Sequence, residues 1–185
     1  MPKGMKLFFK FLNRYFMVPL FRLGLGPVMT NPLSGYIMVM KTIGRRSGKV
    51  RYVPVNYTIW KGCVFCLSGG RNSADWYKNL LAHPEIEIIM PGGAIFGKVD
   101  CPYQGEDRLT IVRQILKNAG FAGFFEGYNP WKISEEELEK KVAEIPVIRI
   151  TPNGLGAGAS DPHGWAWIAF TVIAILIILG IVLLV

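Results

Sequence analysis

MKTIGRRSGKVRYVPVNY, residues 40–57, places two apolar segments on either side of a short basic turn. The segments are rich in aromatic and β-branched residues, which favour strands, and Gly44 and Gly48 bound the turn. The pattern predicts a β-hairpin. Five of the eleven residues from Lys41 to Arg51 are basic. Because like charges repel, we expect an anionic partner against the turn.

The same strand pattern continues outward from this hairpin. The segments with strand composition are 36–43, 50–60, 63–68, 85–90, 94–100 and 145–151. The segments with helical periodicity are 3–17, 73–83, 105–120 and 134–144. Ser73 and Ser134 stand at helix-capping positions, and Pro54 puts its strand at an edge, at a bulge or beside a ligand. The order favours a mainly β fold with helices, of class α+β, whose antiparallel sheet closes as a small barrel.

Positive charge is concentrated in the first part of the chain. Twelve Lys and Arg and no acidic residue precede Asp75, whereas nine basic and thirteen acidic residues occur from there to the end. Such a regional field attracts nucleic acid, anionic lipid or a phosphorylated cofactor.

The C-terminal stretch 165–185 carries no charged residue. As a helix it would reach about 31 Å, which matches a hydrocarbon core of roughly 30 Å. We therefore expect a single-pass transmembrane anchor in the cell membrane, with the basic domain on the cytoplasmic side; a buried core helix is the alternative. With this anchor, nucleic acid is not an expected partner.

Residues 3–17 predict an amphipathic helix with a basic face opposite bulky aromatic side chains, which Pro19 is expected to end. Such a helix suits a membrane interface, so membrane lipid is an expected partner; packing against the domain's own core is the alternative. The expected organisation is an amphipathic segment over 1–29, a barrel domain over 30–151, a flexible linker over 152–164 and the anchor over 165–185.

The three cysteines suggest a reducing compartment. Cys63 and Cys66 are three residues apart on an expected strand and would point to opposite faces, so no metal site is expected.

Two turns carry the chemistry. In the basic turn, the bounding glycines would leave main-chain N–H groups free to face one point, while Arg45, Arg46 and Ser47 add guanidinium forks and a hydroxyl. This arrangement suits a phosphate; the alternative is a solvated basic hairpin, or one pressed against anionic lipid. A second turn, residues 68–70, follows a strand and precedes a helix, and its glycines allow the main chain to approach a flat ligand.

These motifs together resemble the deazaflavin-dependent nitroreductases of the split β-barrel superfamily. The family pattern begins with T-x-G-R-[KR]-S-G and continues with a strand that has an internal Pro, a Gly-Gly turn and W-Y-x-N-L-x-A-x-P. This sequence has TIGRRSG at 42–48, PV at 54–55 and SGGRNSADWYKNLLAHP at 68–84. The resemblance spans about residues 38–151. It implies a split β-barrel that binds coenzyme F-420, an 8-hydroxy-5-deazaflavin with a phospholactyl-polyglutamate tail.

The resemblance also implies a set of cofactor-binding residues. They are Arg45, Arg46, Ser47 and Gly48 at the phosphate end, Pro54 and Val55 beside the ring, Ser68, Gly69 and Gly70 over the ring edge, and Trp76, Tyr77 and Asn79 closing the pocket. The lysine that the family often has after the turn serine is missing here, and Arg71 would supply its charge.

Members of the family reduce quinones, nitroaromatics or other electrophilic acceptors. The expected function is therefore a membrane-anchored oxidoreductase that passes hydride from the reduced deazaflavin to a lipophilic acceptor. Tyr128 is the candidate catalytic residue, as donor to the oxyanion formed on the acceptor, although a structural role among its aromatic neighbours is equally open; Ser68 or N–H groups near Gly69 are alternative donors. A lipid- or fatty-acid-binding barrel without catalysis, or an FMN-binding relative, are the alternative functions, and the resemblance allows a homodimer.

Overall fold

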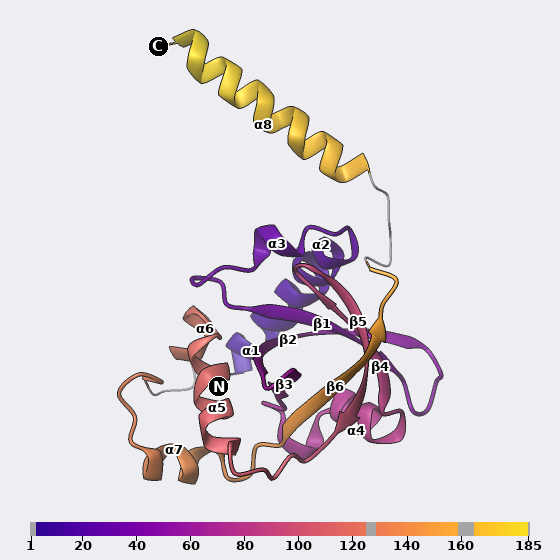
Figure 1. Cartoon of the computed structure of the whole chain (residues 1–185), viewed down its shortest axis with the longest axis vertical. Coiled ribbons are helices and arrows are strands. Elements are labelled where there is room, and N and C mark those ends of the chain that lie inside the picture. The colour runs from indigo at the N-terminus through magenta and orange to yellow at the C-terminus, as the bar shows by residue number, and fades with distance from the viewer. Residues whose placement is uncertain (1–2, 125–128, 159–164, 185) are drawn as a thin grey trace.

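Six antiparallel strands close into one barrel in the order β1-β2-β3-β6-β5-β4 (Figure 1). The computed structural model describes residues 3–124, 129–158 and 165–184. The strands are β1 (Ile37–Ile43), β2 (Val50–Trp60), β3 (Cys63–Leu67), β4 (Glu85–Met90), β5 (Gly93–Asp100) and β6 (Val147–Leu155). The predicted α+β class and the closed antiparallel barrel are confirmed.

Strand β2 has two halves with different surroundings. Against β1 it pairs over residues 50–56, whereas against β3 it pairs over residues 57–60. Among the described residues, the first half of β2 therefore has a ladder partner on its β1 edge alone, and we call its other edge the split. Pro54, opposite Val39, lies in this half, where its missing N–H breaks no bond to β3. The proline is thus explained as an edge residue.

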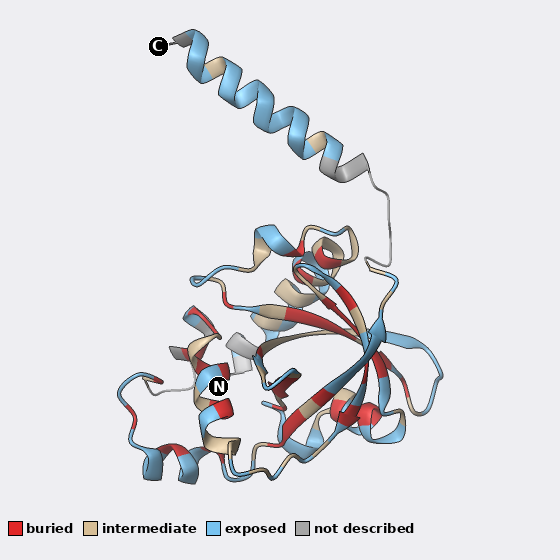
Figure 2. Cartoon of the chain, in the orientation of Figure 1, coloured by how far each residue is buried: buried red, intermediate tan, exposed pale blue. Residues whose placement is uncertain are grey.

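Alternating side chains fill the inside of the barrel. Met38, Met40 and Ile88 are fully buried and belong to one interior cluster. Cys66 lies in the same cluster, whereas Cys63 packs against a second cluster on the outer side of the sheet. The two cysteines therefore occupy opposite faces of β3, as predicted. Figure 2 shows the buried positions concentrated on the strands and on the helices that cover them.

Helices close one end of the barrel and cover one outer side. They are η2 (Arg71–Ser73), α4 (Asp75–Ala82), α5 (Arg108–Lys117), α6 (Phe121–Phe124) and α7 (Glu135–Val142). Helix α4 sends Tyr77 and Leu80 into the interior cluster. Helices α5 and α7 contribute Ile111 and Leu138 to the outer cluster, together with Phe65 of β3. Burial of these apolar faces against the sheet holds the helices in place.

The two predicted serine caps have different outcomes. Ser134 accepts a hydrogen bond from the N–H of Glu137 at 3.2 Å, so this cap on α7 is confirmed. Ser73 instead lies in η2 and its Oγ donates to the carbonyl oxygen of Gly70 at 2.7 Å, while Ala74 takes the N-cap position of α4. The prediction that Ser73 caps the helix is wrong, because its hydroxyl closes the preceding turn instead.

The N-terminal segment is helical for longer than predicted. It forms α1 (Lys3–Leu12), the π-helical turn η1 (Asn13–Met17), α2 (Val18–Arg22) and α3 (Gly26–Met29). Pro19 does not end the helix, because it lies in the first turn of α2 where no main-chain N–H is required. Met17 and Phe21 are buried against the barrel. The large apolar side chains left exposed on α1 and η1 are Leu7, Phe8, Phe11, Tyr15 and Phe16.

The C-terminal part departs from the prediction in two respects. Strand β6 continues to Leu155, so the predicted linker at 152–164 begins inside a strand. No helix among the described residues is long and apolar enough to cross a membrane. The last helix of the described chain is α8 (Trp165–Leu184). This finding contradicts the transmembrane anchor at 165–185 and the cell-membrane localisation derived from it.

Candidate functional site

The basic turn, residues 44–49, is closed by its own main-chain hydrogen bonds. The N–H groups of Ser47 and Gly48 both donate to the carbonyl oxygen of Gly44, at 3.1 and 2.8 Å, and the Gly44 N–H donates to Lys49 at 2.9 Å. Gly48 has a φ of +64°, which favours glycine, and a side chain at Gly44 would meet the Ser47 hydroxyl at 2.7 Å. The glycines thus serve the turn itself, and the N–H groups of Gly44, Ser47 and Gly48 are used within the turn, contrary to the expectation that its main-chain N–H groups face a ligand.

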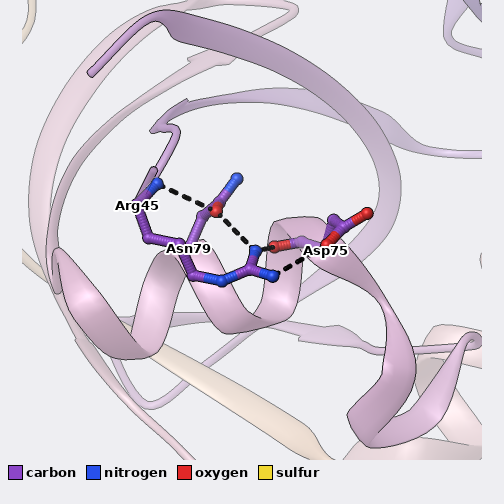
Figure 3. A network of polar contacts seen from close by, with 3 residues as sticks. All are labelled: Arg45, Asp75 and Asn79. Carbon is purple, nitrogen blue, oxygen red and sulfur yellow. Dashed lines mark hydrogen bonds and ion pairs between the residues drawn. The ribbon is translucent and has the colours of Figure 1, made fainter. Parts of the chain in front are cut away.

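Arg45 is fixed to helix α4 rather than facing solvent (Figure 3). Its Nη2 donates to Asp75 Oδ1 at 2.9 Å, and its Nη1 donates to Asn79 Oδ1 at 3.0 Å and to the Asp75 carbonyl oxygen at 3.2 Å. The Arg45 main-chain N–H also donates to Asn79 Oδ1, at 3.2 Å. We call these three residues the latch, because they attach the basic turn to α4 through both main chain and side chain.

Charge around the latch is dominated by cations. The hydrogen bond from Arg45, followed by its charge, holds the pKa of the Asp75 carboxyl below its usual range, and the charges of Lys78 and Arg46 act in the same direction. Arg46, Lys49 and Lys78 are exposed and form no ion pair within the described part of the chain. Once Arg45 is matched with Asp75, these three cations remain available to an anionic ligand.

The glycine turn, residues 68–73, leads from β3 into α4. Ser68 is fully buried, its N–H donates to the carbonyl oxygen of Pro146 at 3.0 Å, and its Oγ donates to that of Arg71 at 2.9 Å. Arg71 has a φ of +53° and forms an ion pair with Glu144. The Ser68 hydroxyl is therefore engaged inside the turn, which weakens its candidacy as a donor to a substrate.

The two glycines of this turn have different surroundings. A side chain at Gly70 would approach the Ala74 Cβ to 2.9 Å, so packing alone accounts for that glycine. A side chain at Gly69 would meet nothing within 4 Å. Both residues are exposed, and the N–H of each has no hydrogen-bond acceptor among the described residues. Gly69 therefore offers open space and a free donor at the surface.

The remaining predicted site residues lie along β2 and α4. Val55 packs into the barrel interior, and Pro54 lies on the same half of β2. Tyr77 is buried in the interior cluster, where burial and the nearby Cys101 raise the pKa of its phenol, so it plugs the barrel end instead of facing solvent. Trp76 is half-buried and meets the Tyr77 ring edge-on at 6.4 Å. Tyr128 lies outside the described residues.

Sequence reasoning missed Asp75 and Lys78. Asp75 is a neighbour of both Lys78 and Asn79 on the surface of α4, because residues three and four apart on a helix are neighbours. A signal for Asp75 was available, since it is the first acidic residue after twelve basic ones. A lone acid in such a field is expected to pair with one of the cations.

Two cavities lie elsewhere on the molecule. One, of about 170 Å³, is behind the glycine turn and is lined by Asn72, Tyr103 and Arg108 among others. The other, of about 130 Å³, lies between α2 and the β4–β5 turn and includes Phe21 and Ile89. Neither cavity is lined by a residue of the basic turn.

A split six-stranded barrel, with a cationic turn and a glycine turn attached to one helix, defines a class of cofactor-binding barrel proteins. Within that class, the model of the F420H(2)-dependent quinone reductase family matches residues 22–121, more than half of the chain. The chain belongs to this family, and it is a deazaflavin-dependent oxidoreductase.

Solved structures resemble the fold at low sequence identity. An F420-H2 Dependent Reductase (FDR-A) is 24% identical, with 65% of this chain and 98% of that chain covered and a TM-score of 0.42. An F420 Reductase is 14% identical, with 68% and 91% covered and a TM-score of 0.45. The heme storage protein HutZ from Vibrio cholerae is 14% identical, with 66% and 86% covered and a TM-score of 0.47. No curated protein matches the chain.

Proposed function

We propose that the protein transfers hydride from reduced coenzyme F-420 to a lipophilic acceptor of the quinone type. The observation that supports this most is the attachment of both turns to α4 beside the split of β2. The glycine turn runs directly into that helix, and the latch bonds the basic turn to it. A cationic end and an open, glycine-lined end are thus held at a fixed spacing.

The residues present fit a cofactor with an anionic tail and a flat ring. Arg46, Ser47 and Lys49 are exposed on the basic turn, where a phosphate and carboxylates would find charge-assisted contacts. Gly69 has no atoms within 4 Å of where a side chain would lie, so a ring can approach the main chain there. Pro54 lies on the half of β2 that borders the split.

The bound deazaflavin supplies hydride from its ring carbon. The chain's own part is to hold the tail on the basic turn, to orient the acceptor and to stabilise the negative charge that forms on it. The free N–H groups of Gly69 and Gly70 are the candidate donors to that oxyanion, since the Ser68 hydroxyl is engaged within the turn. Tyr128 stays a candidate donor.

A binding titration followed by single-turnover reduction tests this function. The full chain is titrated with coenzyme F-420 and, in competition, with FMN; the loaded protein is then mixed with a short-chain quinone. We expect F-420 to bind in preference to FMN and the quinone to be reduced. Preferential binding of FMN, or no binding of F-420, would refute the proposed cofactor, and tight F-420 binding without quinone reduction would refute the acceptor class.

A pair of valine substitutions tests the ring position. Gly69→Val fills the open space at the glycine turn, while Gly92→Val adds the same side chain at the β4–β5 turn, where a side chain also meets nothing within 4 Å. We expect both variants to keep the wild-type unfolding temperature, because neither glycine has a contact or a positive φ to lose. Only Gly69→Val should weaken F-420 binding, by about tenfold or more for a displaced ring contact of at least 1.4 kcal/mol. Equal affinity in the two variants would place the ring elsewhere.

A further inference from the structure

We propose that Lys78, on α4, joins Arg46 of the basic turn in binding the anionic tail of the cofactor, while Arg45 positions the turn and does not hold the tail itself. The inference rests on the proposed cofactor. It assigns different roles to Arg45 and Arg46, two consecutive arginines that the sequence alone does not distinguish.

The placement of Lys78 follows from helix geometry and the latch. Asp75 and Asn79, four residues apart, both contact Arg45. The face of α4 that they define is therefore the face toward the basic turn. Lys78 is three residues after Asp75, and residues at this spacing are neighbours on a helix surface, about 5–6 Å apart at Cβ. The lysine thus emerges beside the junction of helix and turn, where it is exposed.

Arg45 is largely occupied within the protein. Four hydrogen bonds tie it to α4, two of them to the single oxygen of Asn79, and only 24% of its side chain is exposed. Drawing the Arg45 side chain toward a ligand would take the Nη1 donor away from Asn79, which is buried. Arg46, the next residue, is exposed and without an ion pair among the described residues. The neighbouring arginines therefore differ in what each can offer.

The local charge balance favours a ligand with several negative charges. Asp75 matches one cation, Arg45, through a direct ion pair at 2.9 Å. The charges of Lys78 and Arg46 both lower the pKa of Asp75, so both cations lie near this carboxylate. Two cations without an ion pair among the described residues therefore lie around a carboxylate that is already matched by Arg45, and like charges near one another repel. A tail with a phosphate and carboxylates relieves this repulsion and gains contacts on the turn and on the helix.

Paired titrations on the full chain test the proposal. The probes are coenzyme F-420 and the deazaflavin riboside that lacks the tail, each followed by fluorescence at low and at physiological salt. Lys78→Gln removes the charge, Lys78→Arg keeps it, and Lys140→Gln removes the same charge from the exposed face of α7 as a control. Both lysines lie exposed on helix surfaces, so all three variants should fold.

We expect Lys78→Gln to weaken F-420 binding about tenfold at low salt, the effect of one charge-assisted contact, and less at higher salt. Riboside affinity should be unchanged, and Lys78→Arg and Lys140→Gln should stay within about twofold of the wild type because each leaves the contact in place. An equal loss in Lys78→Gln and Lys140→Gln would overturn the inference, as would an equal loss for the riboside. Absence of F-420 binding by the wild type would overturn the proposed function, and the inference with it.

Discussion

Replacing Asn79 by Ala breaks the latch at its buried member. The Asn79 Oδ1 accepts hydrogen bonds from the main-chain N–H of Arg45 at 3.2 Å and from its Nη1 at 3.0 Å. Asn79 is 6% exposed, so water cannot readily replace these bonds. The variant leaves Asp75 and the rest of α4 unchanged, which isolates the contribution of one side chain to the position of the basic turn.

The expected loss of stability can be worked from these two bonds. A neutral bond is worth about 1 kcal/mol and one from a charged donor about 1.5 kcal/mol at a partly exposed site. Alanine is the better helix former and returns roughly 0.5 kcal/mol. The free energy of unfolding should therefore fall by about 2 kcal/mol. With a urea m value of about 2 kcal/mol/M, the midpoint falls by about 1 M.

Urea unfolding tests the predicted loss of stability, and amide hydrogen exchange tests the predicted release of the basic turn. The Arg45 amide is the direct reporter, because its acceptor is the side chain that is removed. Leu81→Ala serves as the matched control, since Leu81 lies on the same helix and is 53% exposed. The reasoning fails if the two variants have the same urea midpoint, or if the Arg45 amide exchanges at its wild-type rate in Asn79→Ala.

Three further outcomes follow from single contacts. Gly120→Ala should lower the unfolding temperature far more than Gly62→Ala: both have positive φ, +57° and +77°, but only at Gly120 would the new Cβ lie 2.3 Å from a carbonyl oxygen. Glu87→Ala should lower the free energy of unfolding by about 3 kcal/mol, measured in urea, because it leaves a partly buried lysine unpaired. The ion pair that lowers the pKa of Asp75 stabilises the fold above the ordinary carboxyl pKa, and this contribution is lost as pH falls through the lowered value; Arg45→Ala should bring the carboxyl's NMR titration back toward its usual range.

The local parts of the fold could be predicted from the sequence. The hairpin of β1 and β2 and that of β4 and β5 follow from alternating apolar residues around glycine turns, and both were confirmed. Their signals lie within a few residues of each other. The closure of the barrel was expected only in outline. The register of β3 against β6 pairs Phe65 with Arg149, and such a distant pairing has no local sequence signal.

The sequence indicated which two turns form the candidate site, but not which contacts their side chains make. The basic turn and the glycine turn were identified from composition and spacing, yet the sequence treats Arg45 and Arg46 alike. Their difference comes from Asp75 and Asn79, some thirty residues further along, and only the fold brings these to Arg45. The hydroxyl of Ser68 likewise looks free in the sequence, because its acceptor depends on the φ of +53° at Arg71.

Helix α4 carries both turns and therefore sets the distance between them. The glycine turn enters α4 at Ala74, and the basic turn is held by the next residue, Asp75, and by Asn79, one helical turn further on. Releasing the latch should therefore disturb the position of the turn against the ring site as well as the tail contacts, so Asn79→Ala should weaken both F-420 and the riboside without a tail. Lys78→Gln leaves the latch intact and should weaken F-420 alone. Riboside titrations of the two variants separate positioning from charge, and identical riboside affinities would show that α4 does not set the spacing.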